Sequence, residues 1–280
     1  MNSFRHLTQA APNVTIQRFL STSAQIFSDP KSVQNIQSLN AIQLEIANGV
    51  FPTLNGLPEV EDVIVTGRAN SGKSSLLNAV LGRKNLVETS SKAGKTRRLD
   101  FFRVGSNSGK FILVDSPGYG QRGRPEWGKL FDSYLRSRKE LRRIYITFSS
   151  KHVVNNVDKA MLMHLTRTII STLFSDGIVS VQNGTSPSLT RIQPVITKAD
   201  QLLNQTSAPD VVSRFKEDIH NAVKEAIDEE HIAAGNMGIS SDILSRMICL
   251  PPLVTTIRTN PLFGIKELRE NIVEACMSKR

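Results

Sequence analysis

The feature that most constrains this chain is the segment 67–74, which reads Gly-Arg-Ala-Asn-Ser-Gly-Lys-Ser. It fits the pattern Gly-x4-Gly-Lys-Ser/Thr, in which a loop wraps an anion with several backbone N–H groups turned inward. Gly67 and Gly72 supply the backbone freedom that this wrapping needs. An apolar run at 61–66 precedes the loop and a helical pattern at 75–81 follows it. The strand, loop and helix in this order predict an α/β fold that binds the phosphates of a nucleotide.

The motif also predicts a role for each part of the loop. We expect Lys73 to place its charge at the β- and γ-phosphates and the Ser74 hydroxyl to coordinate Mg²⁺. A helix that begins here adds its positive end to the anion site. The residues expected to bind the phosphates are Gly67, Asn70, Ser71, Gly72, Lys73, Ser74 and Ser75.

A second candidate site element is Asp115-Ser116-Pro117-Gly118, at the end of an apolar run. An Asp at the C-terminal end of a strand is where an α/β nucleotide fold places a second magnesium contact, and Gly118 can offer its N–H to a γ-phosphate. The alternative is an ordinary turn, since these residue types dominate turns. The position at a strand end, 41 residues after Ser74, favours the functional interpretation.

The third element is Thr197-Lys198-Ala199-Asp200, which follows a short apolar run at 192–196. Guanine presents its N1–H and N2–H2 donors side by side, and one carboxylate can accept from both, so Asp200 is predicted to recognise the base. Lys198 would lay its methylene stem along the base plane. The alternative is a polar helix start with Asp200 as a cap. Thr255 and Thr256 are expected where backbone groups touch the guanine O6.

The rest of the chain supplies the elements around these motifs. Runs at 99–104 and 110–115 flank a turn-rich segment and predict a β-hairpin. Further strands are expected at 143–148, 192–196 and 253–256, and helices at 32–48, 126–141, 157–174, 210–229 and 264–276. Residues 85–97 are interpreted as a long loop, and 176–188 and 233–247 as irregular insertions. The predicted sheet is mostly parallel, with one antiparallel strand and helices on both faces.

The charge of the chain points to a polyanionic partner. Its 35 Lys and Arg residues against 25 Asp and Glu give a formal net charge of +10, which favours nucleic acid or an anionic membrane surface. Two segments, 85–98 and 116–125, are expected to move as a switch. They contain Lys92, Lys95, Arg97, Arg98, Arg122 and Arg124, and they are followed by Arg136, Arg138, Lys139, Arg142 and Arg143. The alternative is a solvated helix face. No apolar run approaches the roughly 18 residues of a membrane-spanning helix, so no membrane span is expected.

The N-terminus has the composition of an organelle transit peptide. It contains Arg5 and Arg18, many Ser, Thr and Gln, and no acidic residue before Asp29. The segment 18–23 resembles a mitochondrial presequence site with a cut between Leu20 and Ser21, and an ordinary frayed terminus is the alternative. The expected organisation is a presequence at 1–20, an extension at 21–58 and a nucleotide-binding domain at 59–280, in the mitochondrial matrix.

Taken together, these motifs resemble the translation-factor class of small GTPases, and most closely the EngB (YihA) family. The resemblance rests on 67–79, on Gly94-Lys95-Thr96, on 115–120 and on 197–200. It implies a P-loop NTPase G domain that binds GTP or GDP with Mg²⁺ and acts in assembly of the large ribosomal subunit, here as a mitochondrial member. It also implies that Thr96 is the switch threonine, so that Lys73, Thr96 and Gly118 act in catalysis and Ser74, Thr96 and Asp115 hold the metal. Ala93 and the segment 149–152 depart from the family pattern and leave surface partners open.

One position predicts slow chemistry. Many GTPases use a Gln immediately after Asp-x-x-Gly to orient the attacking water, and here that position is Tyr119. We therefore expect intrinsic turnover on the order of 10⁻³ s⁻¹ or below, accelerated by a partner. Related GTPases use an Asn at the position of Asn70 to hold K⁺, and this alternative stays open, as do a non-catalytic RNA-binding scaffold that retains GTP binding and a P-loop ATPase or nucleotide kinase.

Overall fold

The computed structural model of the 280-residue chain describes residues 33–34, 61–82, 87, 99–106, 109–120, 125–175, 189–202, 205–234 and 239–277. The predicted presequence, most of the predicted extension and the insertion at 176–188 lie outside the described residues, as does Thr96.

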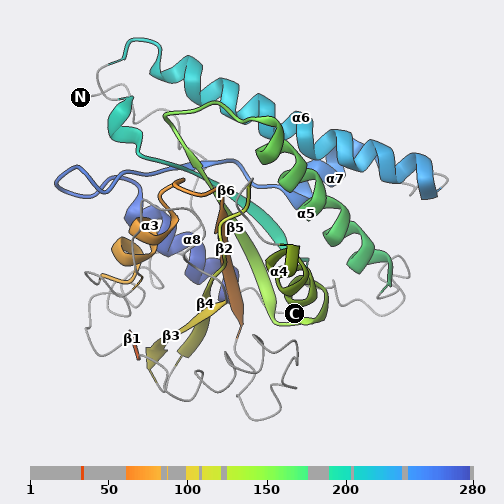
Figure 1. Ribbon diagram of the computed structural model, residues 1–280, viewed down its shortest axis with the longest axis horizontal. Helices are drawn as coiled ribbons and strands as arrows, with labels where there is room; N and C mark the ends of the chain where they lie inside the picture. Colours follow the sequence, from red (N-terminus) through yellow and green to blue (C-terminus); the bar gives the residue numbers. More distant parts are fainter. Residues whose placement is uncertain are drawn as a thin grey trace, which may run out of the picture.

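A seven-stranded sheet forms the centre of the described structure, in the order β1-β3-β4-β2-β5-β6-β7 (Figure 1). Strand β3 runs antiparallel to both of its neighbours, and the other neighbouring pairs are parallel. This confirms the predicted mostly parallel sheet with one antiparallel strand. The strands are β1 (Val33–Gln34), β2 (Asp62–Gly67), β3 (Asp100–Ser106), β4 (Gly109–Asp115), β5 (Leu141–Ser149), β6 (Arg191–Thr197) and β7 (Leu253–Val254).

Helices cover both faces of the sheet, as predicted. Helices α3 and α8 pack on one face, against β2, while α5 packs against β6 on the other face with α4 and α6 beside it (Figure 1). The helices are α3 (Lys73–Val80), α4 (Pro125–Ser137), α5 (Asn156–Ser175), α6 (Ala208–Ala234), α7 (Ser241–Ile248) and α8 (Ile265–Met277), with a short 3-10 helix η3 (Ala199–Gln201). Among the described helices, none is both long and apolar enough to cross a bilayer.

The central strands read as continuous apolar runs because they are covered on both faces. Every residue of β2 and β5 is buried. Since β2, β4, β5 and β6 are parallel, their C-terminal ends meet at one edge of the sheet. All three sequence motifs follow these strand ends, so the fold brings them together.

Three predicted elements were wrong in part. Val33 and Gln34, predicted as helical, pair with β3, whose edge offers free backbone groups to them. The helix expected to reach Leu141 ends at Ser137, and Leu141 begins β5. The insertion at 233–247 contains helix α7, because the Ser240 hydroxyl accepts from the Ile243 N–H at its start and Leu244 and Ile248 are buried, four residues apart on one face.

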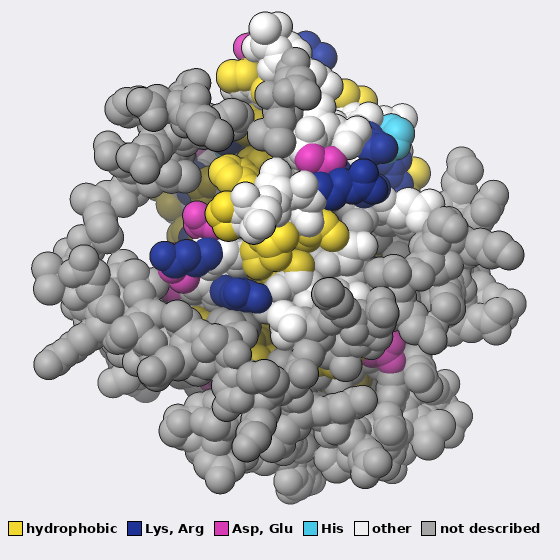
Figure 2. Space-filling model, turned by 90° about the vertical axis from the view of Figure 1, so that its left-hand side faces the viewer, with side chains coloured by type: hydrophobic (Ala, Val, Ile, Leu, Met, Phe, Trp, Pro, Cys, Tyr) yellow, Lys and Arg dark blue, Asp and Glu magenta, His cyan; other side chains and the backbone are white. Residues whose placement is uncertain are grey.

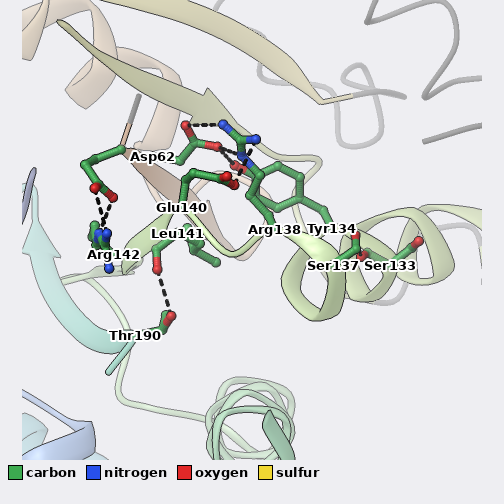
Figure 3. A network of polar contacts seen from close by, with 10 residues as sticks. Asp62, Ser133, Tyr134, Ser137, Arg138, Glu140, Leu141, Arg142 and Thr190 are labelled. Carbon is green, nitrogen blue, oxygen red and sulfur yellow. Dashed lines mark hydrogen bonds and ion pairs between the residues drawn. The ribbon is translucent and has the colours of Figure 1, made fainter. Parts of the chain in front are cut away.

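The other end of the sheet, where β2 begins, holds a buried network of ion pairs (Figure 3). Asp62 accepts a hydrogen bond of 2.8 Å from the Tyr134 hydroxyl and is paired with Arg138, while Arg142 is paired with Glu61. Arg143 donates to the Asn271 carbonyl oxygen at 2.9 Å. These three arginine side chains are largely buried, so their predicted place on a cationic binding surface is wrong. Arg136 and Lys139 are exposed, as that prediction requires.

Candidate nucleotide-binding site

The loop at 67–74 has the backbone geometry that its glycines predict. A Cβ added to Gly67 would lie 1.9 Å from Thr147 Oγ1, so any larger residue there would displace β5 or the loop. Gly72 has a φ of +95°, in the left-handed region that glycine favours. Thr147 Oγ1 donates to the Thr66 carbonyl oxygen at 3.1 Å and lies 2.6 Å from Ser71 Oγ. Thr147 therefore supports the loop from β5, and no pattern in the sequence predicts this contact.

Helix α3 presents an open N-terminus to this loop. It begins at Lys73, Gly72 precedes it without a side-chain cap, and its first turn contains no acidic residue. The first hydrogen bond within the helix joins the Leu76 N–H to the Gly72 carbonyl oxygen at 2.9 Å. The N–H groups of Lys73, Ser74 and Ser75 thus have no acceptor within the helix, which is the arrangement that binds an anion.

Asp115 and Lys73 form a buried ion pair at the centre of the site. One carboxylate oxygen, Oδ1, contacts the Lys73 ammonium group. The other, Oδ2, is buried and has no hydrogen-bond partner among the described residues. Burial raises the pKa of Asp115, and Lys73 opposes that rise. An orphaned carboxylate oxygen on Asp115 and the hydroxyl of the half-buried Ser74 are oxygen donors of the kind that Mg²⁺ takes, so the described residues fit the metal.

Gly118 and Tyr119 lie directly against the phosphate loop. The Tyr119 N–H donates to the Gly67 carbonyl oxygen at 3.2 Å, and its carbonyl oxygen accepts from the Ala69 N–H at 3.3 Å. A Cβ on Gly118 would come within 3.3 Å of Ala69 N and Gly67 O, closer than side chains usually approach. The structure therefore places Gly118 beside the phosphate loop, where the sequence predicted it.

The Tyr119 side chain points away from this backbone pairing towards α5. Its hydroxyl donates to Asp158 Oδ1 at 3.0 Å, and Arg68 Nε lies 3.6 Å from the same oxygen. Burial and the Asp158 charge raise the pKa of Tyr119 well above its ordinary range, so the phenol is neutral at physiological pH. A neutral phenol held as a donor is not a base for the attacking water. Asp158 was missed by sequence reasoning.

The segment 197–200 is tied to the phosphate loop. Thr197 Oγ1 donates to the Ser71 carbonyl oxygen and to Phe148 O, the latter at 3.1 Å. Lys198 Nζ donates to the Asn70 carbonyl oxygen at 2.7 Å, and both residues have positive φ angles, of 59° and 65° respectively. Burial lowers the pKa of Lys198, as do the charges of Lys151 and Arg258. The structure brings this segment and the phosphate loop into one site.

Asp200 is held by two hydrogen bonds and keeps acceptor capacity. Thr256 Oγ1 donates to Oδ1 at 2.7 Å, and Gln201 Nε2 donates to Oδ2 at 2.6 Å. Burial disfavours the charged form, but these two hydrogen bonds, a backbone hydrogen bond and the Arg258 charge together outweigh it, so the pKa of Asp200 lies below its ordinary value. Asp200 lies within η3 and does not cap it, so the alternative interpretation as a helix cap was wrong.

Thr256 lies against Asp200, as the prediction of a base contact requires, but the N–H groups of Thr255 and Thr256 already have partners. The Thr255 N–H donates to the Ile196 carbonyl oxygen at 2.7 Å and the Thr256 N–H to Phe263 O at 3.0 Å, so neither N–H is available to a guanine O6. The Thr255 N–H extends the pairing between β6 and β7, and the Thr256 N–H closes the loop that follows β7. Thr256 contributes through its hydroxyl, which orients Asp200.

Two other candidates stay as predictions. Thr96 lies outside the described residues. Asn70 is exposed on the loop, and its proposed contact with K⁺ stays a prediction.

His164 Nε2 lies 2.6 Å from Asp132 Oδ1, so this histidine is paired with a carboxylate. Within the described part of the chain, no cluster of three or more His, Cys, Asp or Glu side chains could hold a metal ion.

Comparison with known proteins places the relatives of this chain among GTPases. A family model described as 50S ribosome-binding GTPase matches residues 62–175. A protein of Roseobacter denitrificans named "Probable GTP-binding protein EngB" is 30% identical over 220 residues, covering 76% of this chain and 87% of that protein. EngB of Streptococcus pyogenes serotype M18 is 41% identical over 126 residues, which span 43% of this chain and 60% of that protein.

Solved structures agree on the fold. Toc33 from Arabidopsis thaliana in complex with GDP and Mg²⁺ superposes with a TM-score of 0.56 at 16% identity, covering 92% of this chain and 97% of that one. At that identity the likeness concerns the fold alone. The coverage of the Roseobacter relative, together with the three motifs at one sheet edge, shows that the chain belongs to the EngB family of GTPases.

Proposed function

We propose that this GTPase is a slow conformational switch in assembly of the mitochondrial large ribosomal subunit. The observation that carries the switch is the backbone pairing of Tyr119 with Gly67 and Ala69. It joins the phosphate loop to the segment whose Gly118 is expected to bind the γ-phosphate, so a change at either part is transmitted to the other. Family membership, the net charge of +10 and the composition of the N-terminus support the ribosomal and mitochondrial parts of the proposal.

The described residues divide the chemistry among them. Lys73 and the N-terminus of α3 neutralise phosphate charge, and Gly118 offers its N–H to the γ-phosphate. Ser74 and Asp115 would hold Mg²⁺ together with Thr96, and the bound ion would neutralise charge on the β- and γ-phosphate oxygens. The neutral Tyr119 phenol is engaged with Asp158 and takes no proton from water. Intrinsic hydrolysis on the order of 10⁻³ s⁻¹ or below follows, with acceleration by a partner.

The switch itself comprises residues 85–98 and 116–125. In this proposal the γ-phosphate orders both segments and hydrolysis releases them. Potassium bound through Asn70 is a second source of acceleration. A rate that is unchanged when Na⁺ replaces K⁺ would remove potassium from the proposal.

Exposed cations beside the base site offer a surface for RNA. Lys151 follows β5, Arg258 lies on the loop that follows β7, and Lys266 lies at the start of α8; all three are exposed. The charges of Lys151 and Arg258 act on Lys198, and that of Arg258 also acts on Asp200. The loop that follows β7 protrudes at the left of Figure 1, and Figure 2 views the molecule from this side, with hydrophobic side chains gathered near the centre and Lys and Arg on either side. Ile257, Leu262 and Phe263 of the loop are among the exposed large hydrophobic residues. Apolar groups flanked by cations suit nucleic acid, whose bases stack and whose phosphates are anionic.

Sedimentation tests the ribosomal part. The full chain, bound either to a non-hydrolysable GTP analogue or to GDP, is centrifuged with mitochondrial large ribosomal subunits over a series of salt concentrations. We expect co-sedimentation with the GTP analogue, little with GDP, and weaker binding at higher salt. Equal sedimentation in both nucleotide states would contradict a switch, and binding without salt dependence would contradict the electrostatic contribution.

Import into isolated mitochondria tests the proposed location. We expect a protected product whose N-terminus is Ser21. A product that remains accessible to protease outside the organelle would contradict the matrix location. The alternative of a non-catalytic scaffold is distinguished by hydrolysis itself, because a scaffold binds GTP without turnover even when the large subunit is present.

A further inference from the structure

Asp158, near the start of α5, joins this helix to two separate parts of the nucleotide site. Its side chain is only 3% exposed. Oδ1 accepts the Tyr119 hydroxyl at 3.0 Å and lies 3.6 Å from Arg68 Nε in the phosphate loop. Oδ2 accepts the Asn155 N–H at 3.2 Å, and Asn155 Oδ1 accepts the Asp158 N–H at 3.0 Å in return. This reciprocal pair caps α5, so the carboxylate is fixed to a rigid helix.

Tyr119 is consequently held from two sides. Its backbone is paired with Gly67 and Ala69 in the phosphate loop, and its hydroxyl is attached to Asp158 on α5. The peptide that links Gly118 to Tyr119 contains the Tyr119 N–H, which donates to the Gly67 carbonyl oxygen, so this peptide is itself held by the phosphate loop. Because Gly118 precedes the doubly held residue, its orientation depends on both attachments.

We propose that Asp158 is a positioning residue for GTP hydrolysis, which acts through Tyr119 to aim the Gly118 N–H at the γ-phosphate. Asp158 itself touches neither the nucleotide nor the metal. GDP has no γ-phosphate, so the contribution of Asp158 affects GTP binding and hydrolysis and leaves GDP binding unchanged. This assignment also explains what a tyrosine does at the position where many GTPases have a glutamine: it anchors the segment and does not orient the water.

Arg68 completes the arrangement by balancing charge. The buried Asp158 carboxylate faces the Arg68 guanidinium and the neutral Tyr119 phenol, a combination of one cation and one hydrogen-bond donor. A buried carboxylate is stable only when it is paired in this way. Two substitutions separate the contributions, because Tyr119→Phe removes only the hydroxyl and Asp158→Asn keeps an acceptor for it while removing the charge opposite Arg68.

The test compares the two nucleotides in the full chain. Affinities for fluorescent GDP and for a fluorescent non-hydrolysable GTP analogue are measured for the wild type, Tyr119→Phe and Asp158→Asn, together with the single-turnover hydrolysis rate and Tm. Tyr134→Phe is the matched control, because Tyr134 also donates from a buried phenol to a carboxylate, that of Asp62, at the other end of the sheet.

We expect Tyr119→Phe to weaken binding of the GTP analogue and slow hydrolysis at least about fivefold, as loss of one hydrogen bond predicts, with GDP affinity within about twofold of wild type. Asp158→Asn should give a smaller change in the same direction, and Tyr134→Phe should lower Tm without changing the ratio of the two affinities. An equal loss of GDP and GTP-analogue affinity would show that Asp158 serves only the stability of the fold. An unchanged ratio and rate in a folded Tyr119→Phe protein would overturn the proposal. Both outcomes leave the GTPase assignment itself intact, since wild-type hydrolysis tests that separately.

Discussion

Replacement of Asp200 by Asn tests base recognition most sharply, and the structure gives the expected size of its effect. A carboxylate has about four lone-pair sites on its two oxygens. Thr256 and Gln201 each occupy one site, on Oδ1 and Oδ2 respectively. A backbone hydrogen bond also reaches this carboxylate, and the remaining lone pairs can accept from guanine N1–H and N2–H2. In Asp200→Asn, one of the two carboxylate oxygens becomes an NH2 group that faces another donor.

The expected loss follows from these two hydrogen bonds. Each hydrogen bond to a charged group contributes about 1.5–3 kcal/mol, so two contribute about 3–6 kcal/mol. Asp200 is partly exposed, and water competes for the same groups, so we take the lower half of this range. A loss of about 3–4.5 kcal/mol corresponds to a weakening of guanine nucleotide binding by roughly 10² to 10³.

Titration with fluorescent nucleotides measures this loss. Xanthine carries a second oxygen where guanine carries its amino group, so the Asn variant should bind a fluorescent xanthosine diphosphate more tightly than it binds the GDP analogue. Asp228→Asn, an exposed substitution on α6, controls for loss of charge alone and should change neither affinity. An Asp200→Asn protein that is folded and binds the GDP analogue with wild-type affinity would refute the role of Asp200.

Three further predictions follow from the geometry. Gly67→Ala should abolish nucleotide binding measured by fluorescence titration, because the new Cβ would lie 1.9 Å from Thr147 Oγ1, and wild-type affinity would contradict the close packing of the loop. Arg138→Met should destabilise the fold by about 3–5 kcal/mol in urea unfolding, because it leaves the buried Asp62 carboxylate without its cation. Burial raises the pKa of Asp62 above its ordinary 3.8, and Arg138 opposes the rise. Between the pKa of Asp62 in the unfolded chain and its higher pKa in the folded protein, the folded protein binds more protons. The free energy of unfolding therefore falls as the pH rises through this window. Removing Arg138 extends the window upwards, so the loss of stability should be larger at pH 8 than at pH 5, and a loss independent of pH would contradict this account. Burial also raises the pKa of the Cys249 thiol to about 12, so Cys249 should react with iodoacetamide at pH 8 much more slowly than the same residue in the urea-unfolded chain, and equal rates would contradict its burial.

The sequence predicts best those features that the backbone itself demands. Gly67 and Gly72 were identified because only glycine suits a loop that presents N–H groups to an anion, and the structure shows the close contact and the positive φ that require them. Asp115 and Asp200 were identified because strand ends converge at one edge of a parallel sheet. Their positions follow from topology, which local apolar patterns specify well.

The sequence alone does not predict which side chains of distant segments pair with one another. The composition counts three buried cations as surface charge, namely Arg138, Arg142 and Arg143. In the structure they pair with Asp62, Glu61 and Asn271 respectively, and no local sequence pattern predicts those partners. The role of Thr256 was predicted through its backbone, although its hydroxyl makes the contact to Asp200. Asp158 is 39 residues from Tyr119 in sequence, and only the packing of α5 beside the phosphate loop brings the two together.

Single-turnover GTP hydrolysis with and without mitochondrial large ribosomal subunits tests the central claim most directly. The account predicts a rate on the order of 10⁻³ s⁻¹ or below for the free protein and a large increase when subunits are present, with ATP hydrolysed in neither case. A rate that the subunits leave unchanged, or hydrolysis of ATP as fast as that of GTP, would contradict the account.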